Sequence, residues 1–469
     1  MRYSSSVWYL FLLCCLINLP MLRANAQSGG ELVRGPYLQR ATPTSITVRW
    51  RTSTPSTGVV RYGTSGSKLS KTTSEPSATT DHEITVSGLK PNTQYFYSIG
   101  TADVTLQGNN DNFFYTFPTE GTAKKTRIWS LGDFGNHSAR QFNVKNAFKE
   151  YVKGIGDPYI DLWLWLGDNA YNRGQDAEYQ HNVFSADTGY AGDRFMKQTP
   201  IFATPGNHDY AGNNDLRVSL DIPYYQVVSH PTKGEAGGVP SGSESYYSFN
   251  YGNIHFVSLD SDRYDDSTYK ASNVRFGEGS PQLAWLKQDL AAAQTNPKIT
   301  WIIAYWHHPP YTKGTHDSDK EKQLRDVRMN LLPVLEQYKV DLVMGGHSHV
   351  YERSGLLKGH YGDELTFDAS THTANSASKP ASQPGKSESH FVKNRKAAVN
   401  EGTIYVVNGD GGAGGGHVKT GTAQWPHNAM EVSYDGVGGS MYIEIEGNKL
   451  SATMIAGDGS IQDQFTISK

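Results

Sequence analysis

The chain has 469 residues and a formal net charge of −3, and 37% of its residues are hydrophobic, 12% aromatic and 19% charged. This much apolar material excludes a chain that is disordered throughout. The nearly balanced charge excludes binding to nucleic acid or anionic lipid through a general basic surface. At roughly 150 residues per domain, the length predicts about three folded units, or one large and one small domain.

Residues 1–26 have the pattern of a cleaved export signal. Arg2 precedes an apolar run at 8–22, and Ala24-Asn25-Ala26 supplies a small-x-small cleavage site. We expect cleavage near Ala26 and export to a secreted, periplasmic or cell-surface location. The alternatives are an uncleaved membrane anchor, for which the apolar run is short, and a lipoprotein anchor. The rest of the sequence offers no stretch long and apolar enough to cross a bilayer, so we expect no membrane span in the mature chain.

The two cysteines of the sequence, Cys14 and Cys15, both lie inside this leader. The mature chain would therefore contain no thiol, which excludes disulfides and thiolate metal sites. Any metal ion would have to be held by His, Asp, Glu, Asn or Tyr.

Residues 31–118 predict a β-sandwich. Short alternating runs, such as 45–50 and 83–86, are separated by turn residues, and no helical period is apparent. The segment 88–97 looks like the tyrosine corner of fibronectin type III-like domains, with Trp50 as the core tryptophan of an early strand. We expect a packing or spacer module, with framing of a neighbouring site or binding of a partner as the alternative.

From Lys124 onward, apolar strand-like runs alternate with helix-like stretches. The expected strands are 126–131, 162–166, 201–204, 254–259, 301–305 and 341–344, and the expected helices are 139–152, 281–293 and 319–338. Runs that are apolar throughout are typical of strands covered on both faces, which predicts an α/β arrangement.

Five of these strands end in turns that carry acids, amides or imidazoles. The turns are Gly132-Asp133, Gly167-Asp168-Asn169-Ala170-Tyr171, Pro205-Gly206-Asn207-His208-Asp209, Trp306-His307-His308 and Gly345-Gly346-His347-Ser348-His349. Ligands of open α/β sheets bind outside the carboxyl ends of the strands, so we expect these turns to converge on one rim. Each turn alone is a weak indication, because Gly-Asp turns are common.

Taken together, the turns supply two Asp, one Asn, three His and one Tyr as donors. This set is too large for one tetrahedral zinc ion. It suits two metal ions bridged by one carboxylate, a pair that stabilises both the attacking and the leaving oxygen of an in-line displacement at phosphorus.

From about Thr126 to Gly412 the chain resembles the metallophosphoesterase superfamily and, within it, the purple acid phosphatases. The features that narrow the resemblance are the tyrosine of Gly167-Asp168-x-x-Tyr171, the segment Gly346-His347-Ser348-His349-Val350-Tyr351-Glu352-Arg353, and a fibronectin-like domain ahead of the catalytic one, as in plant-type members. The resemblance implies an α/β (α+β) four-layer metallophosphatase sandwich at 124–469. An all-β fibronectin type III-like sandwich at 31–118 would precede it.

The resemblance also implies roles for individual residues. Asp133, Tyr171 and His349 would bind a trivalent iron ion, and Asp168 would bridge both metals. Asn207, His307 and His347 would bind a divalent iron, zinc or manganese ion. His208 would contact the substrate phosphate, with Asp209 as a candidate to orient its ring, and His316 would assist the leaving group.

One position departs from the family pattern. Plant-type members carry a second histidine directly after the position of His316, where this chain has Asp317. His316 then acts alone, Asp317 replaces the histidine, or the substrate preference differs. Because a carboxylate would repel an anionic substrate, we expect Asp317 to be protonated, turned away or salt-bridged.

Other features near these motifs have structural interpretations. We expect His308 to pack in the core, with contact to the site as the alternative. Tyr351-Glu352-Arg353 is expected to support the rim through hydrogen bonds and an ion pair. The polar stretch at about 356–400 is expected to be an insertion, either mobile or gating the substrate.

The sequence therefore predicts an exported dinuclear-metal acid phosphatase that hydrolyses phosphate monoesters by attack of a metal-bound hydroxide on phosphorus. Its partners would be small-molecule phosphate esters, with no nucleic acid expected. A phosphodiesterase or nucleotidase on the same scaffold is the first alternative. A surface binding protein acting through the N-terminal sandwich is the second.

Overall fold

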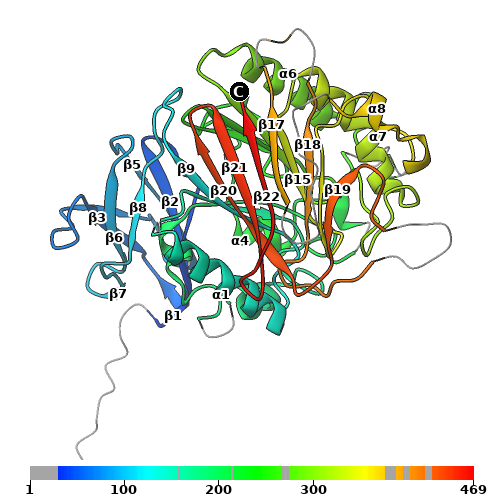
Figure 1. The fold of residues 1–469 in the computed structure, drawn as a ribbon. Helices are drawn as coiled ribbons and strands as arrows, with labels where there is room; N and C mark the ends of the chain where they lie inside the picture. Colours follow the sequence, from blue (N-terminus) through cyan, green and yellow to red (C-terminus); the bar gives the residue numbers. More distant parts are fainter. Residues whose placement is uncertain are drawn as a thin grey trace, which may run out of the picture.

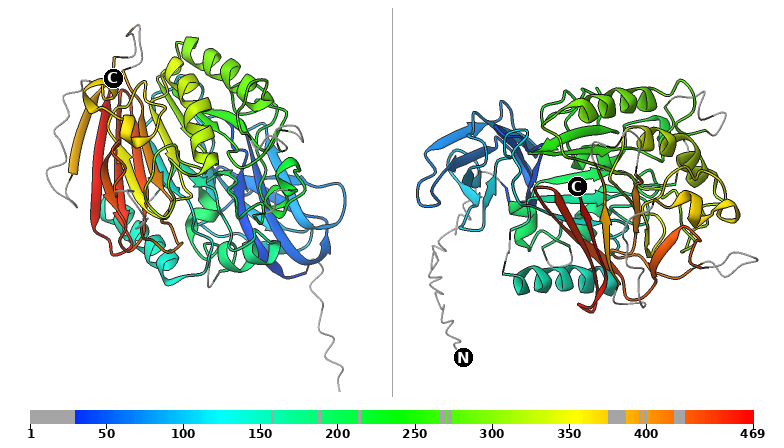
Figure 2. Two further views of the ribbon diagram at one scale, coloured as in Figure 1. Left: turned by 90° about the vertical axis from the view of Figure 1, so that its right-hand side faces the viewer. Right: turned by 45° about the horizontal axis from the view of Figure 1, so that its top comes forward.

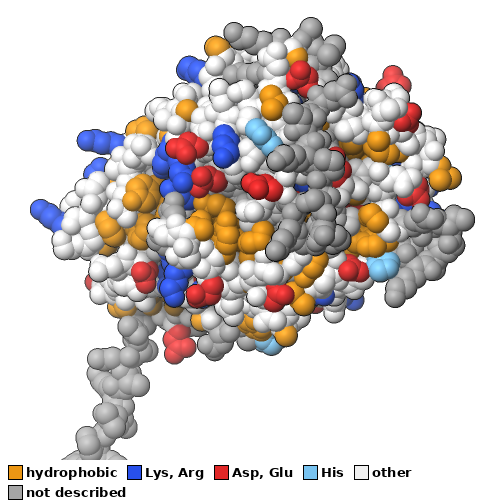
Figure 3. Space-filling view, in the orientation of Figure 1, with side chains coloured by type: hydrophobic (Ala, Val, Ile, Leu, Met, Phe, Trp, Pro, Cys, Tyr) orange, Lys and Arg blue, Asp and Glu red, His pale blue; other side chains and the backbone are white. Residues whose placement is uncertain are grey.

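The computed structural model describes residues 30–156, 159–186, 189–212, 215–265, 270, 274–374, 387–394, 397, 401–417 and 425–469. The expected leader at 1–26 lies outside this part of the chain. No helix within the described ranges is both long and apolar enough to span a membrane. On the face shown in Figure 3, cationic and anionic side chains are interspersed, in keeping with the small net charge.

The N-terminal part is all β, as predicted (Figure 1). One sheet contains β1 (Leu32–Gln39), β2 (Ser45–Ser56) and β5 (Thr79–Ser87), and the other contains β3 (Val59–Gly63), β4 (Lys71–Ser74), β6 (Gln94–Gly100), β7 (Thr105–Gln107) and β8 (Phe113–Tyr115). Trp50 is buried in the core, stacked on His82. The hydroxyl of Tyr95 accepts a hydrogen bond from the Lys90 N–H at 3.0 Å, which closes the expected tyrosine corner.

Charged side chains attach this sandwich to the rest of the molecule. The Arg34 and Arg51 guanidinium groups pair with Asp176 at 2.9 and 2.6 Å. The Tyr37 hydroxyl donates to the Val227 carbonyl at 2.8 Å, and Arg34 and Tyr37 are both almost fully buried. The contacts therefore hold the sandwich against the loops that follow the first strands of the larger part.

The larger part contains two seven-stranded sheets. The first has the order β11 (Ile201–Thr204), β10 (Leu162–Leu166), β9 (Thr126–Leu131), β20 (Gly439–Glu446), β21 (Lys449–Ala456), β22 (Ile461–Ser468) and β17 (Ser387–Val392). The second has the order β12 (Tyr247–Tyr251), β13 (Ile254–Ser258), β14 (Trp301–Tyr305), β15 (Leu342–Gly345), β18 (Ile404–Asn408), β16 (Tyr351–Ser354) and β19 (Met430–Tyr434). Within these sheets β9, β10 and β11 are parallel, as are β13, β14, β15 and β18.

Helices cover the outer faces of both sheets (Figures 1 and 2). The longer ones are α1 (Ala139–Gly154), α6 (Pro281–Thr295) and α7 (Lys322–Gln337), and the shorter ones are α2 (Asp176–Glu178), α3 (Arg194–Gln198), α4 (Pro223–Val227) and α8 (Ala369–His372). Short π and 3-10 turns lie at Tyr179–Val183, Leu216–Val218 and Glu364–Thr366. Ser138 and Ser280 cap α1 and α6 through their side-chain oxygens.

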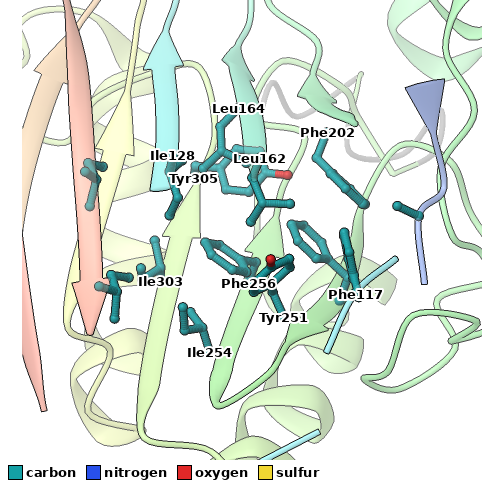
Figure 4. Close-up of a cluster of buried hydrophobic side chains, with 14 of the residues drawn as sticks. Phe117, Ile128, Leu162, Leu164, Phe202, Tyr251, Ile254, Phe256, Ile303 and Tyr305 are labelled. Carbon is teal, nitrogen blue, oxygen red and sulfur yellow. The ribbon is translucent and has the colours of Figure 1, made fainter. Parts of the chain in front are cut away.

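Three buried clusters separate the four layers. Phe148 of α1 stacks on Trp129 of the first sheet, with ring centroids 4.2 Å apart. Between the sheets, side chains of β9 and β10, such as Ile128 and Leu162, face Phe256 and Ile303 of β13 and β14 (Figure 4). The third cluster joins α6 and α7 to the second sheet. This burial confirms the expected four-layer sandwich.

The described part of the polar stretch 356–400 includes a strand. Its residues Ser387–Val392 form β17, which pairs in parallel with β22 at the edge of the first sheet. Leu356 and Leu357 are buried. Residues 375–386, 395–396 and 398–400 of the expected insertion lie outside the described part. The structure therefore places one edge strand inside the expected insertion, and the mobile or gating interpretation of the stretch stays a prediction.

Candidate metal centre

All seven predicted donors follow the carboxyl ends of parallel strands. Asp133 comes after β9, Asp168 and Tyr171 after β10, Asn207 after β11, His307 after β14, and His347 and His349 after β15. The loops after the parallel strands of both sheets meet at one edge of the sandwich, and the structure brings the seven side chains together there.

Four of the donors form one half of the cluster. The Tyr171 hydroxyl lies 2.9 Å from Asp133 Oδ1, 3.3 Å from Asp168 Oδ2 and 3.4 Å from His349 Nε2. His349 Nε2 is also 3.4 Å from Asp133 Oδ1. The four atoms come from three loops and point at a common space.

The other half shares Asp168. Asn207 Oδ1 lies 3.2 Å from His307 Nε2 and 3.0 Å from His347 Nδ1. His307 Nε2 is 3.3 Å from Asp168 Oδ2. Because Asp168 contacts both halves, it is placed to bridge two ions, and this set of hard and borderline donors fits a pair of metal ions.

Backbone groups and one carboxylate fix which nitrogen each histidine presents. His307 Nδ1 donates to the Leu166 carbonyl at 2.9 Å, and His349 Nδ1 donates to the Gly414 carbonyl at 3.1 Å. Both rings therefore turn Nε2 toward the centre. His347 presents Nδ1 instead, and its Nε2 lies 3.5 Å from Glu321 Oε2. Outer partners of this kind orient metal-binding imidazoles.

The backbone at three donors is strained. Asp133, Asp168 and His347 have φ values of 57°, 50° and 66°, a region that non-glycine residues rarely occupy. Glycines allow the close approach of the loops: a Cβ at Gly346 would lie 2.4 Å from Asp133 Oδ2, and one at Gly167 would lie 2.5 Å from His307 Nδ1. Strain that persists in a packed loop is typical of functional sites.

The buried charges strongly perturb one another. Burial and the carboxylates of Asp133 and Asp168 raise the pKa of Tyr171 well above its ordinary value. Burial lowers the pKa of His307, but Asp168 and Asp133 outweigh it and raise that pKa to about 10. Cations bound here would oppose both effects, because they favour the phenolate and the neutral imidazole as ligands.

His208 lies beside the centre rather than in it. Its Nδ1 donates to the Asn172 carbonyl at 2.6 Å, and its ring centroid is 4.5 Å from that of Tyr171. The side chain is 35% exposed, and its Nε2 lies 3.9 Å from Asp168 Oδ2. The expectation that Asp209 orients this ring is wrong, because the Asn172 carbonyl does so.

Asp209 instead ties two of the donor loops together. It accepts hydrogen bonds from the N–H groups of Gly206 and Asn169 at 2.8 and 3.2 Å, and from the Tyr179 hydroxyl. Burial and the nearby Asp168 charge raise its pKa. Its role was not apparent from the sequence, because its partners lie on three different segments.

The loop before α7 carries His316 and Asp317. The His316 ring stacks on the His347 ring with centroids 3.8 Å apart, so the structure places His316 against one of the seven donors. Asp317 is 5% exposed and pairs with Lys313 at 2.6 Å. Of the expected states of Asp317, the structure shows the salt-bridged one.

The remaining predicted features are supporting ones. His308 is buried, and its Nδ1 lies 2.9 Å from Ser261 Oγ, while its ring centroid is 4.4 Å from that of His347. It thus packs in the core directly behind a donor. Arg353 pairs with Asp463 at 2.6 Å, which is the expected ion pair of the Tyr351-Glu352-Arg353 segment.

Glu352 gives a testable pH dependence. Its buried carboxylate accepts hydrogen bonds from the Thr312 hydroxyl and the Lys313 N–H, and burial raises its pKa to about 8. In the unfolded chain that pKa is about 4.3. Between these values the folded state holds a proton that the unfolded state has lost, so stability should fall as the pH rises from about 4.5 to about 8.

Replacing Glu352 with Gln should therefore flatten the pH dependence of stability. Urea denaturation gives the free energy of unfolding at pH 5 and at pH 8.5. Between these pH values it should fall in the wild type by about 2 to 5 kcal/mol more than in Glu352→Gln. The exposed Glu446→Gln variant is the control. Parallel pH curves for wild type and Glu352→Gln would contradict the prediction.

Comparisons with known proteins agree with the fold and the loops. The calcineurin-like phosphoesterase model matches residues 126–351, which contain all seven donors, and the purple acid phosphatase N-terminal domain model matches residues 35–117. Purple acid phosphatase 15 of Arabidopsis thaliana is 27% identical over 59% of this chain, and the match spans only 50% of that relative. Acid phosphatase type 7 of Danio rerio is 26% identical, over 66% of this chain and 68% of its own.

A solved structure shows the same architecture. A purple acid phosphatase from yellow lupin seeds superposes with a TM-score of 0.64 at 18% identity, covering 92% of this chain and 74% of that one. At this identity the superposition supports the fold alone. With both family models matched in order, the chain belongs to the purple acid phosphatases of the calcineurin-like phosphoesterase superfamily.

Proposed function

We propose that this chain is an exported acid phosphatase that hydrolyses small phosphate monoesters at a dinuclear metal centre. The observation that carries the proposal is the convergence of seven oxygen and nitrogen donors on one edge of the sandwich, with Asp168 shared between the two halves. Two bound metal ions would lower the pKa of water and offset the charge of the phosphoryl group.

Two histidines beside the centre would bind the phosphoryl group and protonate the leaving group. With Nδ1–H held by the Asn172 carbonyl, a doubly protonated His208 would donate a second hydrogen bond from Nε2 to a phosphoryl oxygen. His316 would donate a proton to the ester oxygen as the P–O bond breaks, so that the alcohol leaves neutral. Its ring lies against a donor histidine, which places it at the edge of the centre.

The two halves suit different metals. A buried phenolate is a hard, anionic donor that favours a trivalent ion, so we assign iron(III) to Asp133, Tyr171 and His349. The neutral amide of Asn207 and the imidazoles of His307 and His347 suit divalent iron, zinc or manganese. A tyrosinate–iron(III) pair would absorb visible light, and Tyr171→Phe should abolish that band. A variant that keeps the band would contradict the assignment.

The test of the activity compares an aryl phosphate monoester with an aryl phosphate diester. The protein used is the chain from Gln27 onward, with Asn207→Ala as the inactive control and Asp458→Asn, on an exposed turn, as the matched active one. Preference for the monoester and loss of turnover in Asn207→Ala would support the proposal. Preference for the diester would replace it with a phosphodiesterase on the same scaffold. No turnover of either ester by metal-loaded protein would overturn it.

A further inference from the structure

Glu321 joins the two histidines at the edge of the centre. Its Oε1 lies 2.9 Å from His316 Nδ1, and its Oε2 lies 3.5 Å from His347 Nε2. The two imidazoles stack on each other at 3.8 Å, so one carboxylate spans the outer edges of a stacked pair. The role of this residue could not be predicted from the sequence, because it is separated from both donor motifs.

The position of Glu321 at the start of α7 restrains its carboxylate. It is the N-cap residue of α7, and it also accepts the Asp317 N–H at 3.1 Å. The positive end of a helix dipole favours an anion at this point.

The other acidic residues of the loop before α7 form ion pairs with basic side chains, and Glu321 contacts the His316 ring. Lys313 pairs with Asp317 and Asp319 at 2.6 and 3.1 Å, and Arg328 pairs with Asp319 at 2.9 Å. These ion pairs anchor the loop through Asp317 and Asp319. The carboxylate of Asp317 pairs with Lys313, whereas the carboxylate of Glu321 contacts the imidazole of His316.

We propose that Glu321 is a positioning residue that sets the ring orientation and tautomer of His316 for proton donation to the leaving group. The proposal rests on the proposed phosphatase function. With Nδ1–H held by Glu321, the ring presents Nε2 to the substrate, and a misplaced or flipped ring would present carbon instead. The doubly protonated ring gives its Nε2 proton to the ester oxygen while the P–O bond breaks, and the neutral ring that remains keeps its Nδ1–H, which still donates to Glu321.

This role predicts a dependence on the leaving group that a purely structural role would not produce. A dinitrophenolate leaves without a proton, whereas an alkoxide needs one. Glu321→Ala should therefore lower kcat on an alkyl phosphate by about 10²-fold, the usual contribution of a general acid, and on dinitrophenyl phosphate by less than about threefold. Glu321→Gln, whose amide oxygen can still accept the Nδ1–H, should recover much of the alkyl rate.

The same measurements on His316→Ala and on the double variant complete the test. His316→Ala should show the same selective loss, and adding Glu321→Ala should cost nothing further. Glu336→Gln, at the other end of α7, is the matched control and should keep both rates. The metal content of every variant is measured by mass spectrometry and should stay at two ions per chain.

The outcomes separate this proposal from the function on which it rests. A wild type that hydrolyses neither monoester overturns the function. An active wild type whose Glu321→Ala loses both rates equally, or loses metal, overturns the positioning role and assigns Glu321 to supporting His347. A third metal ion in the wild type that is lost in Glu321→Ala would make the residue a ligand and would also overturn the proposal.

Discussion

Replacing Asp168 with Asn should reduce the turnover of phosphate monoesters by at least about a thousandfold, which corresponds to about 4 kcal/mol of transition-state stabilisation. Asp168 is 1% exposed, and its carboxylate lies beside the donor atoms of both halves of the centre, at Tyr171 and at His307. A neutral amide removes the negative charge that would hold two cations close together. The metal content should fall below two ions per chain, measured by mass spectrometry alongside the kinetics.

Two controls make the Asp168 result specific. Asp458→Asn makes the same chemical change on an exposed turn and should retain both activity and metal. Circular dichroism should show that Asp168→Asn is folded, because the backbone that positions Asp168 is held by the strands on either side. A folded Asp168→Asn variant that keeps two metal ions and more than about a tenth of the activity would contradict the bridging role.

The core strands and the donor set could be predicted because their signals are local. The strands expected at 126–131, 162–166 and 301–305 have those bounds in the structure. Each is a short apolar run that ends at a glycine or at a polar turn. The donors follow such runs directly, so the parallel order of the strands was sufficient to bring them together.

The start of α7 was predicted less well. The sequence suggested Asp319 as the first residue, whereas the helix begins at Lys322. Asp319 is held by Lys313 and Arg328 in ion pairs that draw the preceding segment away from the helix axis. The contact between Glu321 and His316 depends on the same displacement of the segment before the helix. Such contacts depend on tertiary position and leave no periodic pattern in the sequence.

The strand β17 was missed for a different reason. It lies at the edge of the first sheet, and its segment, Ser387–Val392, alternates small, charged and aromatic residues without a clear apolar run. Its register comes from β22, which lies at the far end of the chain. An edge strand needs to bury only part of one face, so the usual hydrophobic signal is weak.

Removing the carboxylate of Asp463 should be among the most destabilising single changes in the protein. Asp463 lies on β22 of the first sheet and pairs with Arg353 on β16 of the second, so the pair crosses the layer between them. Both side chains are 0% exposed, and the Tyr351 hydroxyl donates to the same carboxylate at 2.7 Å. Asp463→Ala would leave a buried guanidinium without its main partner, at a cost of about 3 to 5 kcal/mol.

The expected loss is measured as a shift of the urea midpoint, against a surface pair as control. Glu150 and Lys153 lie on α1 with side chains 74% and 77% exposed, so Glu150→Ala should cost about 1 kcal/mol or less. Replacing both partners by apolar residues, as in Arg353→Met with Asp463→Leu, should recover much of the loss, because no charge is then left buried. If Asp463→Ala cost no more than Glu150→Ala, the pair would not hold the sheets together. Because β16 begins two residues after His349, a loosened pair should also weaken metal binding before the protein unfolds.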